Sequence, residues 1–562
     1  MPRPIPIGEQ NYSSLREDNC FYVDKTHFIS EWWKEKDRVT LITRPRRFGK
    51  TLMLDTVRTF FSPEFKDRPE LFAGLSITQD EKLMALRGKV PVIFLSFASI
   101  KGSNYRETLR AIKYALEDAY GTFRFLLNDE GLLTDHERKA FLQVSREMPD
   151  EDAKTALHEL SKYLERFYGI KPIILLDEYD TPMQEAWLAG YWDEIVGFLR
   201  GFFNSTFKTN PHLGRGLMTG ITRVSKESLF SDLNNLRVVT VTSPLYSDCF
   251  GFTEEEVFAA MDEYGLTDKA GVKAWYDGFI FGKAKDIYNP WSVIGYLSER
   301  RLLPYWAGTS SNAMVGELIG TGDALIKEQA EILLKGGSVR VAFDEQIVFS
   351  QLRDAPGAIW SFLLAAGYVK VLEHDDAESE YEIALTNHEV TITLERLIGA
   401  WFNKTSLSRY SAEFRRALIA GDLISLNQML NIIAGETFSW FDVTGREPER
   451  FYHGFVLGLL VDLKKRYALE SNRESGFGRY DVMLIPLDKD KDPGIVIEFK
   501  TLNSARGEKE LGDAAAAALE QIRERNYAAE LLARGIPAER IHAYGIAFQG
   551  KSVLVAGGRA EI

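Results

Sequence analysis

The sequence of 562 residues predicts an α/β protein with two separate sheets, one in the first half of the chain and a smaller one near its end. The first sheet is indicated by a strand, loop and helix pattern whose loop ends in Gly-Lys-Thr at 49–51, and by an apolar strand that ends in the acidic pair 177–178. The second is indicated by a hairpin pattern between residues 481 and 500 that carries two acids and a lysine.

The first pattern begins with an apolar, β-branched run at 39–43 and passes through a loop rich in Pro and Arg into a helical pattern. A strand, a loop ending in Gly-Lys-Thr and a helix form the arrangement of a phosphate-binding loop, in which N–H groups at the helix N-terminus bind the anion. We expect Lys50 on the β- and γ-phosphates of a nucleotide and Thr51 on Mg²⁺. The general pattern has a glycine where this chain has Arg44, so the residue that most easily adopts positive φ is missing.

The second half of a nucleotide site is expected on another strand. Four apolar residues at 173–176 precede Asp177 and Glu178, and such a run suits a strand covered on both faces. Acids at the C-terminal end of a strand lie where open α/β sheets bind ligands. We expect Asp177 to hold Mg²⁺ through water and Glu178 to orient or deprotonate the attacking water. The plain alternative is a strand end with solvated acids.

Further strands are expected at 90–97 and 214–222, with helical spacing over 104–168 between them. Strands that alternate with helices favour a parallel sheet. Thr222 ends the last of these strands and Arg223 follows it, and both are candidate sensors of the γ-phosphate. A strand-end turn with a solvated arginine is the alternative.

Composition excludes several classes of protein. A hydrophobic content of 45% with 27% charged residues is that of a globular chain. The 81 acids and 68 bases give a formal charge of −13, which disfavours a histone-like nucleic-acid binder but allows an enzyme with a local basic groove. Two cysteines imply no disulfide framework, and the eight histidines show no zinc-like spacing. Without a signal region or a membrane-spanning apolar stretch, we expect a cytoplasmic protein with no membrane partner.

Four segments carry a resemblance to a known family: RPRRFGKT (44–51), LLDEYDTPM (175–183), GITRVSKESLFSDLNNL (220–236) and YNPWSV (288–293). They resemble the AAA-ATPase-like family of bacterial proteins, in which an Arg-rich loop replaces the first glycine. The resemblance covers roughly the first half of the chain and implies a P-loop ATPase that uses ATP and Mg²⁺. The nucleotide-binding residues it implies are Arg46, Arg47, Phe48, Gly49, Lys50, Thr51, Asp177 and Arg223. Arg46 and Arg47 would contact phosphate or a neighbouring subunit, which leaves a homo-oligomer open.

From residue 252 the pattern becomes helical, and Thr253 and Glu256 have the spacing of a capping box. Aromatic clusters follow at 275–278 and 288–292. We interpret this region as a helical lid packed on the ATPase domain. A stacking surface for single-stranded nucleic acid is the alternative, but basic residues do not interleave densely enough to favour it.

Near the C-terminal end, residues 481–485 and 495–500 flank a polar turn and so predict a hairpin. With the turn centred near 489–490, Asp481 lies opposite 498–499, and Glu498 and Lys500 share one face. Two neighbouring carboxylates repel unless a cation neutralises them, and oxygen ligands suit Mg²⁺ or Mn²⁺. Lys500 would position or deprotonate the water activated there. A salt bridge between Asp481 and Lys500 is the alternative.

This unit resembles the PD-(D/E)XK nuclease superfamily, with Asp481 as the motif's Asp and Glu498-Phe499-Lys500 as its Glu-x-Lys. The resemblance implies that Asp481 and Glu498 bind the metal and that Lys500 assists catalysis. It also implies an auxiliary Gln521 on a helix followed by Tyr527, with His453 and Glu474 at places where relatives carry accessory polar residues. The superfamily does not fix the substrate. The expected substrate is DNA, with RNA left open.

We therefore expect four parts: a P-loop ATPase domain over 1–235, a helical lid over 236–330, a connecting mixed α/β region over 331–440, and an α/β/α restriction-endonuclease-like domain over 441–562. The functional hypothesis is an ATPase whose nucleotide state gates a metal-dependent nuclease in a defence or mobile-element system. The first alternative is a nucleotide-regulated switch that binds nucleic acid or a partner without cutting. The second is an ATPase acting on protein assemblies, with the nuclease-like domain as a docking module.

Overall fold

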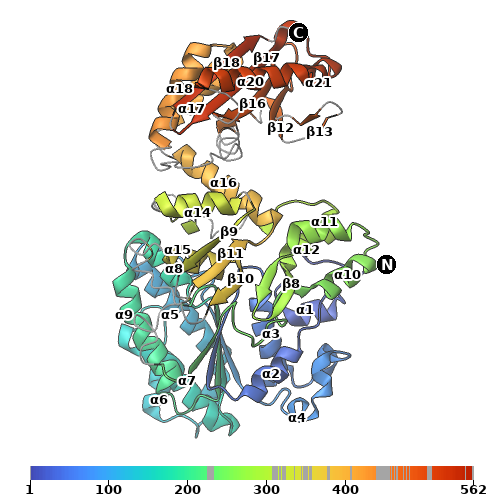
Figure 1. The fold of residues 1–562 in the computed structure, drawn as a ribbon. Coiled ribbons are helices and arrows are strands. Elements are labelled where there is room, and N and C mark those ends of the chain that lie inside the picture. The colour runs from blue at the N-terminus through green and yellow to red at the C-terminus, as the bar shows by residue number, and fades with distance from the viewer. Residues whose placement is uncertain are drawn as a thin grey trace. The chain divides into compact units, whose positions relative to one another are not determined.

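The structure is a computed structural model (Figure 1). It describes residues 2–223, 233–306, 314–315, 318, 324–334, 336–342, 345, 352, 357–375, 380–404, 408–437, 456, 459–460, 463, 466–471, 474–475, 478–479, 481–502, 509–550 and 552–559. The chain divides into two compact units, the first made of Met1–Thr309 and Ser338–Thr391, the second of Ser310–Gly337 and Ile392–Ile562. The expected division into four parts stays a prediction.

The first unit is built on a five-stranded parallel sheet with the strand order β2-β3-β4-β1-β5. Its strands are β1 (Val39–Thr43), β2 (Val92–Ser96), β3 (Ile173–Asp177), β4 (Arg215–Gly220) and β5 (Leu236–Val239). All residues of β1 and β3 are buried, as their mainly apolar and β-branched composition predicts. The parallel α/β fold is confirmed, and β5 is an edge strand that the sequence did not reveal.

Helices cover both faces of this sheet, with α7 and α9 on one side and α2 and α3 on the other (Figure 1). The helices before β4 are α1 (Tyr12–Glu17), α2 (His27–Glu35), α3 (Lys50–Phe61), α4 (Glu81–Met84), α5 (Tyr105–Thr122), α6 (Asp135–Gln143), α7 (Asp150–Tyr168), α8 (Thr181–Ala189) and α9 (Trp192–Phe203). Asn104 caps α5 with its side chain, and Gly169, at φ +69°, ends α7. The helical spacing read over 104–168 is therefore confirmed.

After β5 the first unit forms two small antiparallel sheets with helices beside them. The elements are β6 (Phe252–Thr253), α10 (Glu254–Glu263), α11 (Lys269–Tyr276), β7 (Phe279–Phe281), β8 (Ala284–Tyr288), α12 (Pro290–Glu299), β9 (Ser338–Ala342), α15 (Ala358–Ala366), β10 (Val369–Asp375) and β11 (Glu380–Leu385). The capping box between Thr253 and Glu256 is confirmed. The sheet order β6-β8-β7 adds a short β-structure to the region expected to be helical.

The second unit contains a mixed sheet with the order β12-β15-β16-β17-β18. Its strands are β12 (Tyr467–Ser471), β15 (Val482–Pro486), β16 (Gly494–Thr501), β17 (Ile541–Gln549) and β18 (Ser552–Arg559). Only β16 and β17 of these are parallel, and α20 (Leu511–Glu524) and α21 (Ala528–Ala533) connect them. The short strands β13 (Glu474–Ser475) and β14 (Gly478–Arg479) pair separately.

Successive side chains of a strand point to opposite faces of this sheet, and each face packs in its own hydrophobic core. Met483 and Val496 pack with α20 and α21 residues such as Ile522 and Leu531. The neighbouring residues of the same strands pack with α17 (Ser408–Ala420) and α18 (Leu423–Thr437). The unit is thus layered helix, sheet, helix, and the expected α/β/α class is confirmed. Helix α14 (Ala324–Leu334) also belongs to this unit, and α16 (His388–Lys404) runs from the first unit into the second.

Residues 451–466, whose apolar spacing favours a helix, fall mostly outside the described residues. Those described within this range, among them Val456, Leu460 and Leu463, are buried in the core beside α17 and α18. Across the described part of the chain, no helix is long and apolar enough to span a membrane.

Candidate functional site

The loop after β1 leads directly into the N-terminus of α3. Gly49 precedes the helix in the left-handed region at φ +79°, and no side chain caps this helix start. Arg47 is also left-handed, at φ +68°. Nothing lies within 4 Å of where a Cβ on Gly49 would stand. The first N–H groups of this 12-residue helix therefore have no side-chain cap, as is usual where a helix start binds an anion.

Arg44 occupies the position at which the general phosphate-loop pattern has a glycine. Its φ is not positive, so this backbone position does not need glycine, and the left-handed residue of the loop is Arg47 instead. The Arg44 side chain is fully buried and donates to the carbonyl oxygens of Thr43, Thr240 and Tyr246 at 2.9, 2.7 and 3.3 Å. Burial lowers the pKa of Arg44 to about 10. Arg44 thus fastens the loop to the segment after β5.

The residues expected on phosphate and Mg²⁺ converge at the same edge of the sheet. Lys50 Nζ is buried and donates to the carbonyl oxygens of Arg44 and Pro45 at 2.9 and 2.8 Å, and burial lowers the pKa of Lys50. Thr51 Oγ1 donates to Asp177 Oδ2 at 2.7 Å. Burial raises the pKa of Asp177, whose carboxylate has lost most of its contact with water.

Thr219 completes this contact and was not identified from the sequence. Its hydroxyl on β4 donates to Asp177 Oδ1 at 2.6 Å, so both carboxylate oxygens of Asp177 are oriented by threonines. The sequence did contain a signal for Thr219, since it is a polar residue within an otherwise apolar strand that was expected to neighbour the strand of Asp177. Glu178, at φ +49°, accepts from Thr181 Oγ1 at 3.0 Å.

Thr222 has a structural contact that the sensor hypothesis did not include. Its N–H and its hydroxyl donate to Asp180 Oδ2 at 2.9 and 2.7 Å, and its carbonyl accepts from Tyr179 at 2.8 Å. Arg223 follows immediately at the same edge and is half-buried. Asp180 thus anchors the end of β4 to the turn that carries Glu178.

The remaining loop residues point in different directions. Arg47 places its guanidinium 4.0 Å from the centroid of the Trp291 ring. The Arg46 side chain contacts Gln184 Oε1 at 3.4 Å, and the Arg46 carbonyl accepts from Trp306 Nε1 at 3.3 Å.

Phe48 packs away from the loop. Its ring lies against those of Phe279 and Phe281, with centroids 4.7 and 5.2 Å away, and is 1% exposed. Its side chain holds the loop on β7, and only its backbone can face a phosphate.

These residues fit a magnesium nucleotide. The uncapped start of α3 suits the phosphates, and Lys50 supplies the nearby positive charge. Thr51 and Asp177 bring the hydroxyl and carboxylate that Mg²⁺ takes in P-loop sites within 2.7 Å of each other.

The second group of predicted residues lies at one end of the β15–β16 hairpin. These strands pair antiparallel with Val482 opposite Ile497 and Leu484 opposite Ile495, which confirms the register predicted from the turn centre. Asp481, one residue before β15, lies beside the start of the Glu498–Lys500 segment. The Phe499 N–H donates to Asp481 Oδ2 at 2.8 Å.

The side chains of Glu498 and Lys500 lie on the face of β16 that α20 covers. Glu498 is 3% exposed, and Gln521 of α20 donates from Nε2 to Glu498 Oε1. Lys500 Nζ lies 4.0 Å from the same oxygen. Tyr527 is buried beside them and hydrogen-bonds Gln521, and burial raises the pKa of Tyr527.

This donor set fits a divalent cation. Asp481 and Glu498 are two carboxylates from adjacent strands, each oriented by a neutral donor, and hard oxygen ligands select Mg²⁺ or Mn²⁺. Glu474 lies in β13, but its side chain is outside the described residues, as is all of His453.

Comparison with known proteins supports both resemblances. Residues 6–230 match the AAA-ATPase-like family, described as "Predicted AAA-ATPase", and residues 447–557 match the PD-(D/E)XK nuclease superfamily. An "Uncharacterized protein in vnfD 5′region" of Azotobacter chroococcum mcd 1 is 26% identical over 570 residues, covering 99% of this chain and 98% of that protein. The similarity to that protein therefore extends over both matched regions.

Proposed function

The chain carries an AAA-ATPase-like domain followed by a PD-(D/E)XK nuclease superfamily domain, and from this we propose that it hydrolyses ATP and cleaves DNA phosphodiesters with a divalent metal. The observation that carries the nuclease proposal is the convergence of Asp481, Glu498 and Lys500 at one end of a hairpin, with Gln521 on Glu498. All three residues of the motif, Asp481, Glu498 and Lys500, are present, which argues against a copy of the fold that has lost its catalytic residues.

In the nuclease site, Asp481 and Glu498 would hold Mg²⁺ or Mn²⁺. The bound metal would polarise a phosphodiester oxygen and activate a water. Lys500, 4.0 Å from Glu498, is placed to orient that water and to balance the charge that develops on the phosphate. Gln521 fixes the Glu498 carboxylate through its Nε2 donor.

In the ATPase site, the start of α3 and Lys50 would hold the phosphates, and Thr51 and Asp177 would hold Mg²⁺. Glu178 follows Asp177 at the same strand end and would orient the hydrolytic water. Its left-handed backbone, at φ +49°, turns the chain at this point and is a strained conformation of the kind found at functional sites.

We further propose that the nucleotide state gates DNA cleavage, because both domains belong to one chain. Arg46 and Arg47 would contact phosphate or reach a neighbouring copy, so a homo-oligomer is part of the proposal. The proposed partners are ATP and DNA, and the proposed setting is a cytoplasmic defence or mobile-element system.

The test is cleavage of linear duplex, circular duplex, single-stranded DNA and RNA by the full chain with Mg²⁺ or Mn²⁺, with and without ATP. Wild type runs beside Asp481→Ala and Lys50→Ala. We expect metal-dependent cutting of DNA that Asp481→Ala abolishes, and a response to ATP that Lys50→Ala removes.

Each other outcome identifies a different function. Retained DNA binding without cutting under any metal supports the nucleotide-regulated switch. ATP hydrolysis stimulated by a protein but not by DNA supports an assembly ATPase. Cutting by Lys50→Ala with an unchanged ATP response removes the gating proposal and leaves the nuclease intact.

A further inference from the structure

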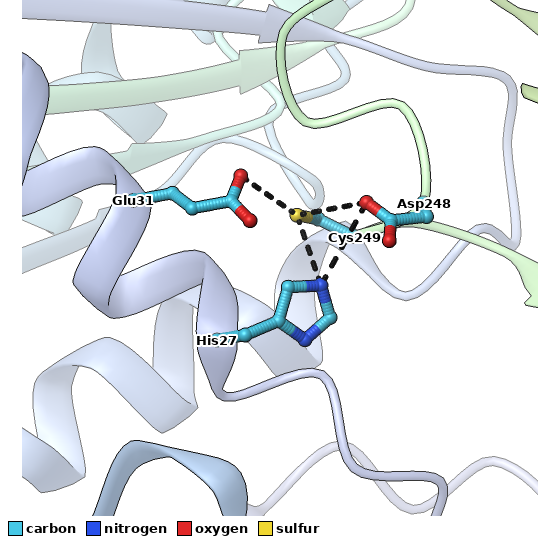
Figure 2. Close-up of side chains that lie close together, drawn as sticks. All are labelled: His27, Glu31, Asp248 and Cys249. Carbon is cyan, nitrogen blue, oxygen red and sulfur yellow. Dashed lines mark hydrogen bonds and ion pairs between the residues drawn. The ribbon is translucent and has the colours of Figure 1, made fainter. Parts of the chain in front are cut away.

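Four side chains that can bind a metal meet where α2 approaches the segment after β5. His27 and Glu31 lie four residues apart and therefore on one face of α2, while Asp248 and Cys249 are adjacent in the other segment. Figure 2 shows all four side chains directed toward one another, with Cys249 Sγ between Glu31, Asp248 and His27. One ligand atom of each lies within 4.8 Å of all the others.

The spacing of these atoms is close to that of a tetrahedral site. Cys249 Sγ lies 3.4 Å from His27 Nε2 and 3.8 Å from both Glu31 Oε2 and Asp248 Oδ1, and His27 Nε2 lies 3.8 Å from Asp248 Oδ1. Zinc bonds of roughly 2.0–2.3 Å at tetrahedral angles place ligand atoms about 3.3–3.6 Å apart. The two remaining distances, from Glu31 to His27 and to Asp248, are at most 4.8 Å, so an inward movement, mainly of the Glu31 carboxylate, would bring the four atoms onto one ion.

The charge of the cluster also suits a dication. Burial raises the pKa of the Cys249 thiol, the Glu31 and Asp248 carboxylates add to this effect, and burial raises the pKa of Glu31. A cation at the centre would reverse these effects and favour the thiolate. Lys25 stands just outside, donating from Nζ to the Asp248 carbonyl at 2.7 Å and pairing with Glu256 at 2.7 Å.

We propose that His27, Glu31, Asp248 and Cys249 bind one Zn²⁺ ion. Four protein ligands of N, S and O type fill a tetrahedral shell, so this site is structural. Cys249 is buried, whereas His27 and Asp248 have side chains 30% and 56% exposed, which gives the ion an entry path from solvent.

The position of the ion defines what it would hold together. The segment that carries Asp248 and Cys249 also supplies the Tyr246 carbonyl that accepts from Arg44. Two residues after Cys249, Gly251 packs against Phe48 so closely that a Cβ there would lie 3.0 Å from two ring carbons. Bound zinc would link α2 to the segment that contacts both Arg44 and Phe48. Because Arg44 and Phe48 belong to the phosphate-binding loop, the ion would stabilise the position of that loop.

The competing explanation is an ion pair between His27 and Asp248 beside an inert thiol. The hydrogen bond from His27 lowers the pKa of Asp248 and raises that of His27, as such a pair requires. The two explanations differ in whether the Cys249 sulfur becomes a metal-bound thiolate. A thiolate signal also separates this site from the carboxylate site around Asp481.

The test is titration of the full chain with Co²⁺ as a spectroscopic probe of a zinc site, with Mg²⁺ in excess. We expect one equivalent to produce a thiolate-to-Co²⁺ charge-transfer band that Zn²⁺ displaces. Cys249→Ser should lose the band, and Cys20→Ser is the matched control that should keep it, because Cys20 is the other buried cysteine and lies outside the cluster. The absence of the band in wild type, or a band that survives in Cys249→Ser, overturns the proposal.

Thermal unfolding gives a second readout that does not depend on a cysteine variant folding well. A chelator first removes any bound metal, and Zn²⁺ is then added. The added Zn²⁺ should raise the Tm of wild type, because a ligand that binds only the folded state stabilises that state. His27→Gln, a substitution of a partly exposed side chain, should lose that rise. A rise of equal size in wild type and His27→Gln would place the ion elsewhere and overturn the proposal.

Discussion

Thr51 Oγ1 donates to Asp177 Oδ2 at 2.7 Å, joining the first turn of α3 to the end of β3 across 126 residues of chain. Thr219 donates to the second oxygen of the same carboxylate from β4. Asp177 is buried and would be costly as an isolated charge, so the two threonine hydroxyls compensate part of the cost of burying it.

Asp177→Asn should separate stability from function. Burial raises the pKa of Asp177, so the folded state holds the proton more tightly than the unfolded state. Its contribution to stability is then greatest below the ordinary carboxyl pKa and is lost as the pH rises. At neutral pH the neutral, nearly isosteric Asn should unfold at a Tm equal to or above that of wild type, while Mg²⁺-dependent ATP hydrolysis is lost. A clear fall in Tm would show that the carboxylate is structural.

Arg44→Gly, which restores the glycine of the general phosphate-loop pattern, should inactivate the ATPase site. The change leaves several buried carbonyl oxygens without their donor, at a cost of at least about 3 kcal/mol in the free energy of unfolding. Urea unfolding and ATP binding measure both effects. The control is Arg110→Ala, an exposed arginine paired with Glu147 at 3.1 Å, which should change stability by about 1 kcal/mol or less. Tighter ATP binding by Arg44→Gly would contradict this account.

The sequence predicted the elements whose signal is local. Strand β1 is a largely apolar, β-branched run, β3 begins with four apolar residues, and the β15–β16 register follows from the centre of its turn. The edge strand β5 was missed because it is short and only one of its four residues is buried. Asp177 ends β3, Glu498 and Lys500 lie within β16, and Asp481 comes directly before β15, so these residues could be named in advance from local patterns.

Contacts between distant segments could not be predicted. The carbonyl groups of Thr240 and Tyr246, which accept from Arg44, lie about 200 residues further along the chain, and Cys249 is 222 residues from His27. For this reason the spacing of histidines along the chain does not indicate the proposed zinc site. The packing of α17 and α18 on the second sheet likewise depends on tertiary contacts. Their role in the core of the second unit could therefore not be predicted from their own residues.

Glu389 should make the stability of the first unit depend on pH. Burial raises its pKa to about 7, although Ser292 Oγ and the Trp306 N–H donate to it at 2.7 and 2.6 Å. A carboxyl whose folded pKa is raised contributes stability below its ordinary pKa and loses it as the pH rises through about 7. Relative to Glu389→Gln, wild type should lose about 3 kcal/mol between about pH 4.5 and pH 8, as measured by urea unfolding. A difference between the two proteins that does not vary with pH would contradict this assignment.

Gln521→Ala should weaken the proposed nuclease site without abolishing its activity. The Gln521 amide orients the Glu498 carboxylate, and loss of such a supporting contact costs about 10- to 100-fold in metal affinity or activity. Higher Mg²⁺ should recover part of the cleavage rate in Gln521→Ala but none in Asp481→Ala. The Mg²⁺ dependence of DNA cleavage distinguishes the two variants, and identical behaviour would contradict a positioning role for Gln521.

The most direct test of the central claim is the rate of Mg²⁺-dependent DNA cleavage by Lys500→Ala beside wild type. Lys491→Ala is the matched control, because Lys491 is an exposed lysine in the turn of the same hairpin. We predict that wild type and Lys491→Ala cleave at the same rate and that Lys500→Ala is slower by at least about 100-fold while still binding DNA. Equal cleavage by all three proteins would contradict the assignment of this hairpin as a nuclease site.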